Sequence, residues 1–169
     1  MIIEILKYTP KWVFGLLIFL IILGFKQSKD REVKKLMILP LPVGMAFLSF
    51  FGAYSSFGLV ALPIGLWFIA LAGISYVVAK YYPVKGVSYD LAKERFFIPG
   101  SWLPLQLMMA IFFTKYVVGI LNALQPSIIV STSFVISISL VYGIFSGIFA
   151  ARAMSVWRVI RWEPVEGNT

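Results

Sequence analysis

Five long hydrophobic stretches, separated by polar segments, dominate the pattern along the chain. They cover residues 10–25, 36–54, 59–78, 102–124 and 128–151. An α-helix rises about 1.5 Å per residue, so about 20 apolar residues cross the hydrocarbon layer of a bilayer. The first stretch is short, and we expect it to thin the bilayer locally or to extend through Lys26 and Gln27. The pattern predicts an all-α integral membrane protein with five transmembrane helices.

Two of the polar segments are charged loops. Residues 26–35 (KQSKDREVKK) contain five basic and two acidic residues, which is typical of a solvated loop. Residues 80–101 form the only sizeable loop, in which the β-prone segments GVSYD and RFFIP flank the polar turn LAKE. This arrangement predicts a small hairpin on the membrane surface. The hairpin is either structural or a gate or partner site, and the structural role is preferred.

Charged residues are scarce in this chain. They make up 13% of the 169 residues, while 60% are hydrophobic. A soluble domain contains about 25% charged residues. The composition therefore predicts a single membrane domain over residues 1–169, without a separate soluble domain.

Five transmembrane helices would place the loops alternately on the two sides of the membrane. The basic residues are unevenly distributed between these two sides. Of 15 Lys and Arg, five lie in loop 26–35, four in loop 80–101 and three after residue 151. These regions share one side, and the positive-inside rule makes that side cytoplasmic, with the N-terminus outside and the C-terminus inside. The net charge of +8 then reflects topology and contact with anionic membrane lipids. Nucleic-acid binding is disfavoured, because the basic residues are scattered over short loops.

Residue patterns for catalysis and metal binding are missing from the sequence. The chain has no His and no Cys, which removes thiolate ligands, the usual haem ligand and the commonest zinc ligand. It also has no serine–histidine pair, no paired carboxylates and no phosphate-cradling loop. We therefore expect a protein that is not an enzyme and has neither a cofactor nor a metal site.

One lysine lies inside an apolar stretch. Lys115 is the only charged residue in 102–124, past the midpoint of the predicted helix. Its ammonium group can reach the far headgroups, bond to carbonyl or hydroxyl groups, or hold an anionic group in a cavity. With Tyr116 and Thr114 beside it, Lys115 is the candidate ligand site or polar cluster, to which Ser137 or Ser139 would add if their depths match. The sequence leaves these roles open.

Small residues in the last hydrophobic stretch predict close helix packing. Gly143 and Gly147 are four residues apart, a spacing that lets two helices approach closely. Packing within the chain is the preferred interpretation, and a homodimer interface is the alternative. Residues 41–54 and 103–116 also share Leu-Pro, Phe-Phe and a final Tyr, a weak sign of parallel repeats such as transporters contain.

Three phrases of the chain together resemble a known family. They are ILKYTPKWVFGLLIFLIILGFKQSKDREV, FFIPGSWLPLQLMMAIFFTKYVVG and LVYGIFSGIFAARAMSVWR. The family that they resemble consists of small bacterial multi-spanning inner-membrane proteins classed as a domain of unknown function. The resemblance covers most of the chain and implies a bacterial inner-membrane location and a helical membrane fold. It implies no catalytic or binding residues.

Two functions fit these observations. The first is a transporter or channel for an anionic or amphipathic solute, suggested by Lys115, the serine-rich last helix and the weak repeat. Predicted helices two to five contain no Asp or Glu, which disfavours coupled cation transport. The second is a non-catalytic lipid-binding protein or structural partner of an envelope complex, whose basic loops contact anionic headgroups.

Overall fold

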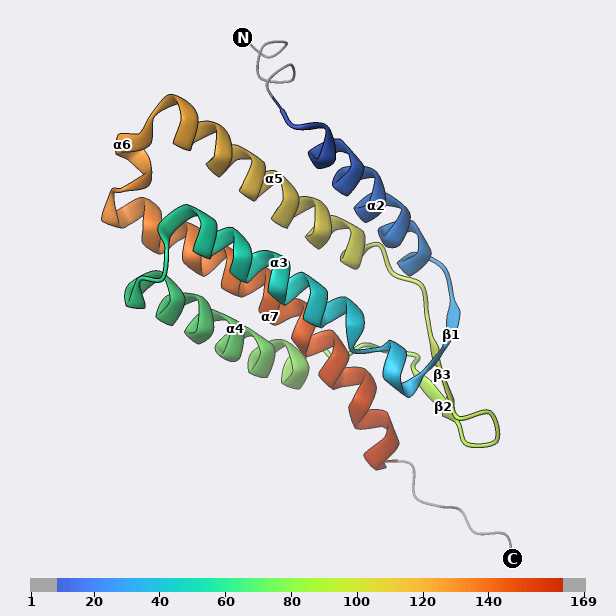
Figure 1. Ribbon diagram of the computed structural model, residues 1–169. Helices are drawn as coiled ribbons and strands as arrows, with labels where there is room; N and C mark the ends of the chain where they lie inside the picture. The colour runs from blue at the N-terminus through green and yellow to red at the C-terminus, as the bar shows by residue number, and fades with distance from the viewer. Residues whose placement is uncertain (1–8, 163–169) are drawn as a thin grey trace, which may run out of the picture.

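Long helices, closed at one end by a small sheet, make up the structure (Figure 1). The computed structural model describes residues 9–162, and the side chains of residues 9–159. The helices are α2 (Lys11–Gln27), η1 (Lys35–Met37), α3 (Pro40–Phe57), α4 (Ala61–Tyr81), α5 (Leu103–Leu124), α6 (Pro126–Ile129) and α7 (Thr132–Trp162), where η1 is a 3-10 turn. The strands are β1 (Arg31–Lys34), β2 (Ser88–Asp90) and β3 (Arg95–Ile98).

Within residues 9–162, four helices are long and apolar enough to cross a membrane, namely α3 together with η1, α4, α5 and α7. Helix α2 has 17 residues. Such a helix is about 25 Å long, somewhat less than the hydrocarbon layer. Both ends of α2 are bonded to the α5 region: the Ser101 N–H donates to the Gln27 carbonyl (3.0 Å), and the Thr9 and Tyr116 hydroxyls share a hydrogen bond (2.8 Å). The five predicted helices are thus four of membrane-crossing length and a shorter one that lies along α5.

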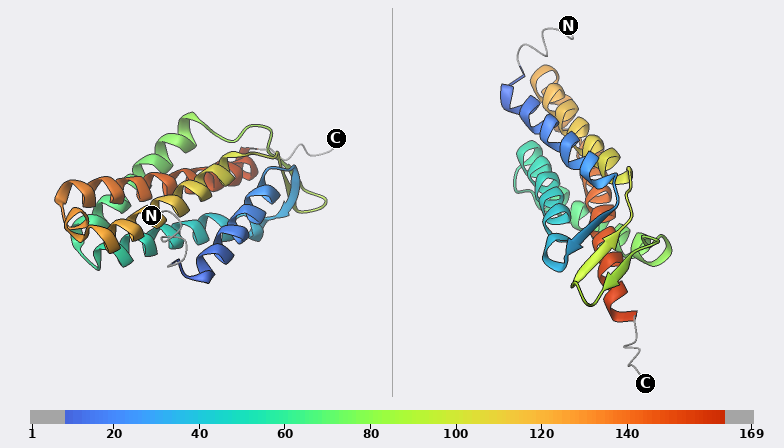
Figure 2. Two further views of the ribbon diagram at one scale, coloured as in Figure 1. Left: turned by 90° about the horizontal axis from the view of Figure 1, so that it is seen from above. Right: turned by 90° about the vertical axis from the view of Figure 1, so that its right-hand side faces the viewer.

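The helices form two groups. Helix α2 lies beside α5, and α7 packs against α3 and α4 (Figures 1 and 2). The groups share one apolar core, in which Met45 of α3, Met108 and Ile111 of α5 and Tyr142 of α7 are all buried.

Prolines mark the starts of several helices. Pro40 opens α3, Pro104 lies in the first turn of α5, and Pro126 opens α6. A proline fits there because the first turn leaves its N–H groups without intrahelical partners.

The predicted last helix, 128–151, differs most from the structure. A separate turn, α6, precedes α7, and α7 continues to Trp162 because Val156 still presents an apolar side chain to a buried cluster.

A three-stranded antiparallel sheet of order β1-β3-β2 joins the two charged loops. The predicted hairpin is confirmed, with Tyr89 of β2 opposite Phe96 of β3. Within the segment 26–35, where the sequence indicated only a solvated loop, the structure contains β1, whose Val33 also lies opposite Phe96. Successive residues of a strand face opposite sides of a sheet, so β1 turns Val33 inward and Glu32 outward.

The inner face of this sheet covers a second, smaller core. Phe96 is fully buried there, and Tyr89 and Ile98 lie beside it. Ile38, just before α3, and Val156 of α7 close the cluster from the helical side. The sheet is therefore held to the helices by apolar packing.

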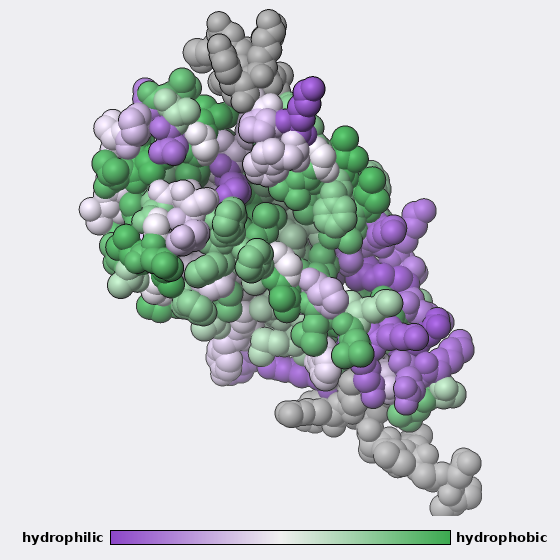
Figure 3. Space-filling view, in the orientation of Figure 1, coloured by the Kyte–Doolittle hydropathy of each residue, from purple (hydrophilic) through white to green (hydrophobic). Residues whose placement is uncertain are grey.

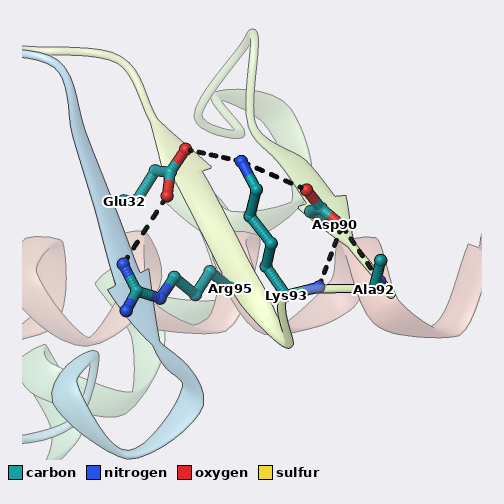
Figure 4. Close-up of polar contacts among 5 residues, drawn as sticks. All are labelled: Glu32, Asp90, Ala92, Lys93 and Arg95. Atoms are coloured by element: carbon teal, nitrogen blue, oxygen red, sulfur yellow. Dashed lines mark hydrogen bonds and ion pairs between the residues drawn. The ribbon is translucent and has the colours of Figure 1, made fainter.

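The outer face of the sheet carries ion pairs (Figure 4). The Glu32 carboxylate lies 3.6 Å from Lys93 Nζ and 3.7 Å from a guanidinium nitrogen of Arg95. Asp90 lies 3.8 Å from Lys93 Nζ and accepts the backbone N–H groups of Ala92 and Lys93 at 2.9 and 3.1 Å. These side chains are about half exposed, so each ion pair stabilises the fold by under about 1 kcal/mol.

The charged regions of the chain gather at the sheet end. The sheet joins segments 26–35 and 80–101, and the last turns of α7 pack beneath it through Val156. Figure 3 shows hydrophilic side chains concentrated at this end, while most of the remaining visible face is hydrophobic. The three basic regions thus lie at the same end of the helices.

Helices α4 and α7 approach each other closely at two glycines. A Cβ atom on Gly143 would lie 2.5 Å from the Trp67 carbonyl oxygen and 2.6 Å from Ala70 Cβ. A Cβ atom on Gly147 would lie 2.9 Å from both the Leu71 carbonyl oxygen and Ile74 Cβ. The preferred interpretation, packing within the chain, is confirmed for this glycine pair.

A buried serine connects α3, α4 and α7. Ser49 Oγ accepts a hydrogen bond from Trp67 Nε1 (2.9 Å) and donates one to the Tyr142 carbonyl (2.9 Å). Ser49 and Tyr142 are fully buried, and Trp67 nearly so. One hydroxyl thus satisfies polar groups on two neighbouring helices in an apolar core.

Candidate functional site

Lys115 of α5 is bonded to a hydroxyl on α3. Its Nζ atom donates to Ser55 Oγ (2.9 Å) and lies 5.2 Å from the centre of the Phe51 ring. Ser55 is two residues before the end of α3, at the end of the bundle opposite the sheet. The sequence leaves three roles open for Lys115, and the structure shows its ammonium group in one of them, bonded to a hydroxyl group. A ligand-binding role for Lys115 stays a prediction.

The other members of the predicted cluster point elsewhere. Thr114 Oγ1 donates to the Ala110 carbonyl of its own helix (2.7 Å). The Tyr116 hydroxyl bonds to Thr9, and its ring stacks on Phe112. Consecutive residues of an α-helix point about 100° apart, so the three side chains are not brought together. Ser137 donates to its own helix and Ser139 is buried, so neither is seen bonded to Lys115.

A cavity of about 250 Å³ lies at the sheet end of the molecule, between the helices and the sheet. We call it the basic cavity. It is lined by Leu23, Lys26, Gln27, Arg31, Val33, Met37, Ile38, Leu41, Pro42, Val84, Ile98, Pro104, Phe149, Arg152, Ala153 and Val156. Its walls thus combine apolar side chains from four helices and the sheet with a few polar ones, which is the usual make-up of a ligand site.

Three cations and no carboxylate line the described walls of the basic cavity; the cations are Lys26, Arg31 and Arg152. Arg31 donates to the Gln27 carbonyl at 3.2 Å. Arg152 is partly buried and forms neither a hydrogen bond nor an ion pair with the described residues. A guanidinium group has five N–H donors, so most donors of Arg31 and Arg152 have no acceptor among the described residues.

The strand geometry of β1 separates the carboxylates from the basic cavity. Arg31 and Val33 line the cavity, whereas Glu32, between them, lies on the outer face with Lys93 and Arg95. Asp30, at the start of the strand, accepts the Gly100 N–H at 2.6 Å. Gly100 is required there, because a Cβ atom would collide with the Ser28 carbonyl. The acidic groups nearest in sequence are therefore committed elsewhere.

The polar groups of the basic cavity are incompletely solvated. Burial lowers the pKa of the Arg31 guanidinium from its usual value, which means that its charged form lacks some of the stabilisation that water gives. Gln27 Oε1 is buried and has no hydrogen-bond partner among the described residues. A buried polar atom without a partner costs about 1–3 kcal/mol. The fold thus carries charge and polarity here that its own residues do not neutralise.

Sequence reasoning missed this cavity. It assigned Lys26, Arg31 and Arg152 to loops and a tail that set the orientation, and it used Gln27 only to lengthen a short helix. Arg152 does continue the helical spacing of the buried residues Tyr142, Ser146 and Phe149. That spacing is the one signal by which the sequence could have indicated an inward-facing arginine.

Comparison with known proteins gives a family without an assigned activity. The profile of a family described as “Family of unknown function (DUF6622)” matches residues 1–164. No curated protein and no solved structure matches the chain.

Proposed function

The chain belongs to the family of unknown function DUF6622, and we propose from its own geometry that it is a membrane protein that binds an anionic amphiphile in the basic cavity. The observation that carries this proposal is Arg152, a partly buried cation with no partner among the described residues. Burying a charge is costly unless it is paired. An anionic headgroup would supply that pair, and the apolar walls suit the first carbons of its chains.

We further propose the setting in which this binding takes place. Helix α2 crosses the membrane with the other four long helices, the N-terminus lies outside and the sheet lies in the cytoplasm of a bacterial cell, at the inner membrane. Positive-inside charge bias supports this orientation. The basic cavity then opens at the level of the anionic cytoplasmic leaflet, whose lipids are its partners. The protein acts without catalysis, cofactor or nucleic acid, and a homodimer remains part of the proposal.

Replacing Arg152 with glutamine tests the proposed function. We expect the affinity for phosphatidylglycerol to fall by about tenfold or more, because a hydrogen bond to a charged group contributes about 1.5–3 kcal/mol. Native mass spectrometry of the detergent-released protein, titrated with the lipid, measures this change. Thermal stability is expected to stay the same or rise, because the variant removes a partly buried charge that has no ion-pair partner among the described residues.

Lys115→Met is the matched control for this measurement. It also removes one cation, but Ser55, its partner, is 13 residues along α3 from Pro42 at the cavity wall. That separation is about 20 Å in a helix. The control is expected to bind the lipid as the wild type does. Equal lipid binding by Arg152→Gln and wild type would refute the proposed function.

Transport of the anionic amphiphile across the membrane is the second candidate function. Ser139, Tyr142 and Ser146 lie on the buried face of α7 that continues to Phe149 at the cavity wall. Their hydroxyl groups have no hydrogen-bond partner among the described residues. Unpaired polar atoms inside a membrane protein favour a pathway for a polar group.

Tyr142→Phe tests the transport candidate. In liposomes that contain a fluorescent phosphatidylglycerol analogue, we expect the variant to slow translocation several-fold because it removes one buried hydroxyl from the pathway. Binding of the headgroup in the basic cavity is expected to stay unchanged. Translocation by the wild type that does not exceed that of protein-free liposomes would remove transport from consideration.

A further inference from the structure

We propose that the basic cavity selects a phosphate group with two negative charges, the terminal phosphomonoester of a lipid, over the singly charged phosphodiester of common phospholipids. This inference rests on the proposed function and narrows its ligand class. It follows from the charge of the cavity, from the donors on its walls and from its size.

The charge of the basic cavity exceeds what one monoanion neutralises. Lys26, Arg31 and Arg152 all line it, and no described carboxylate does. Arg31 and Arg152 line the same cavity, so their like charges repel each other. A phosphodiester would compensate one of the two guanidinium charges, whereas a phosphomonoester compensates both. The doubly charged ligand therefore relieves the repulsion between the arginines and gives each of them an ion-pair partner, which neither has among the described residues.

The donors of the basic cavity match the three terminal oxygens of a phosphomonoester. Guanidinium groups bind phosphate through paired N–H donors, and a lysine contributes a point charge. A phosphomonoester carries about −1.5 to −2 charges near neutral pH and has three strong acceptor oxygens. A phosphodiester has one terminal oxygen fewer, because a second ester bond occupies it. Two guanidinium groups and one ammonium group are thus better satisfied by the monoester.

Gln27 places a neutral amide where a carboxylate would block such a ligand. Its backbone carbonyl accepts the Arg31 hydrogen bond, and its side-chain Oε1 is buried without a partner in the part of the chain that the structure describes. The amide Nε2 is not among the buried unpartnered atoms, so its N–H donors remain accessible to a bound anion. A glutamate of the same shape would instead pair with the arginines and neutralise them internally.

The size and lining of the basic cavity favour a lipid over free phosphate. Its volume of about 250 Å³ lies below the range of about 300–1,000 Å³ typical of pockets that enclose a whole drug-sized ligand. It accommodates a headgroup, while acyl chains would lie along the helices outside. Leu23, Leu41 and Val156 on its walls provide apolar contacts that a free inorganic ion cannot use.

Two lipids with identical chains test the charge selectivity. Phosphatidic acid carries the phosphomonoester and phosphatidylglycerol the phosphodiester, and inorganic phosphate is the third probe. By native mass spectrometry near pH 8 we expect phosphatidic acid to bind about tenfold tighter than phosphatidylglycerol, the equivalent of about 1.4 kcal/mol. The advantage should shrink near pH 6, because the second phosphate proton has a pKa of about 6. Inorganic phosphate at the same concentration should displace neither lipid.

Gln27→Glu provides a test in which binding and stability change in opposite directions. We expect the variant to lose the preference for phosphatidic acid, because its carboxylate repels the ligand and pairs with the arginines. Its thermal midpoint should rise, because the partly buried guanidinium groups gain a charged partner. Misfolding would lower both the preference for phosphatidic acid and the thermal midpoint, so it cannot produce a loss of preference together with a higher midpoint. A lower midpoint in a folded variant would show that the carboxylate does not reach the arginines and would overturn the inference.

The remaining outcomes separate this inference from the proposed function. Equal binding of the two lipids, with both lost in Arg152→Gln, overturns the selectivity and leaves the proposed function standing. Lipid binding that is independent of Arg152 overturns both. If inorganic phosphate displaces a bound lipid as effectively as phosphatidic acid does, the preference for a dianion stands. The claim that the ligand is a lipid is then overturned.

Discussion

Replacing Gly143 with leucine is expected to lower the free energy of unfolding by about 3 kcal/mol or more. Even the first side-chain atom has no room, since it would lie 2.5 Å from the Trp67 carbonyl oxygen and 2.6 Å from Ala70 Cβ. The obstacle on α4 is backbone, which cannot rotate aside as a flexible side chain can. Helices α4 and α7 would have to separate, and close van der Waals packing is what holds helices together in a bilayer.

The matched control for this prediction is Gly73→Leu on α4. A Cβ atom at Gly73 meets nothing within 4 Å, so the added side chain has open space. Its thermal midpoint in detergent, measured by fluorescence-detected size-exclusion chromatography, is expected to stay close to that of the wild type. The Gly143 variant should lose the monodisperse peak at a much lower temperature. Equal losses in the two variants would contradict the close packing of α4 and α7.

Ser49→Ala is expected to destabilise the protein by about 1–3 kcal/mol, although it removes a single oxygen atom. The substitution leaves Trp67 Nε1 without its acceptor in a nearly fully buried position. It also removes the donor to the Tyr142 carbonyl, although that group can still bond within its own helix. The orphaned indole N–H therefore accounts for most of the expected cost.

A double-mutant cycle isolates that contribution. Trp67→Phe removes the N–H, so Ser49→Ala should cost less in the Trp67→Phe background than in the wild type. Ser137→Ala is the control, because the Ser137 hydroxyl is exposed and donates only to the Ser133 carbonyl of its own helix. The thermal midpoint in detergent, measured for each variant as for the Gly143 variant, is the readout. Additive effects of the Ser49 and Trp67 substitutions would show that their hydrogen bond does not stabilise the fold.

The helices of this protein could be predicted because their cause is local. A long apolar stretch in lipid must satisfy its own backbone groups, and a helix does so within the segment. The hairpin was also predictable, since GVSYD and RFFIP flank a polar turn at a short distance. Strand β1 was not, because only one of its four residues (REVK) is apolar. Its pairing is decided by Phe96, more than 60 residues away, against which Val33 lies.

The candidate site depended even more on distant parts of the chain. Lys115 stood out because it is the only charge in the apolar stretch 102–124, yet its ammonium group is bonded to Ser55. Arg31 and Arg152 look like ordinary basic residues of a loop and a tail. They meet only because β1 pairs with β3 and because α7 continues past residue 151 to the same end of the molecule. Neither cause is visible in the residues next to them.

Pairing of β1 with β3 also constrains how the chain is inserted during synthesis. Strand β1 leaves the ribosome before α3 and α4, and its partner strand follows both helices. The two strands can meet only if the chain crosses the bilayer an even number of times between them. A nascent chain in which only one of α3 and α4 inserts would leave β1 and β3 on opposite sides of the bilayer, with their pairing edges exposed. Completion of the sheet therefore requires that α3 and α4 insert together, because insertion of one without the other keeps the two strands apart.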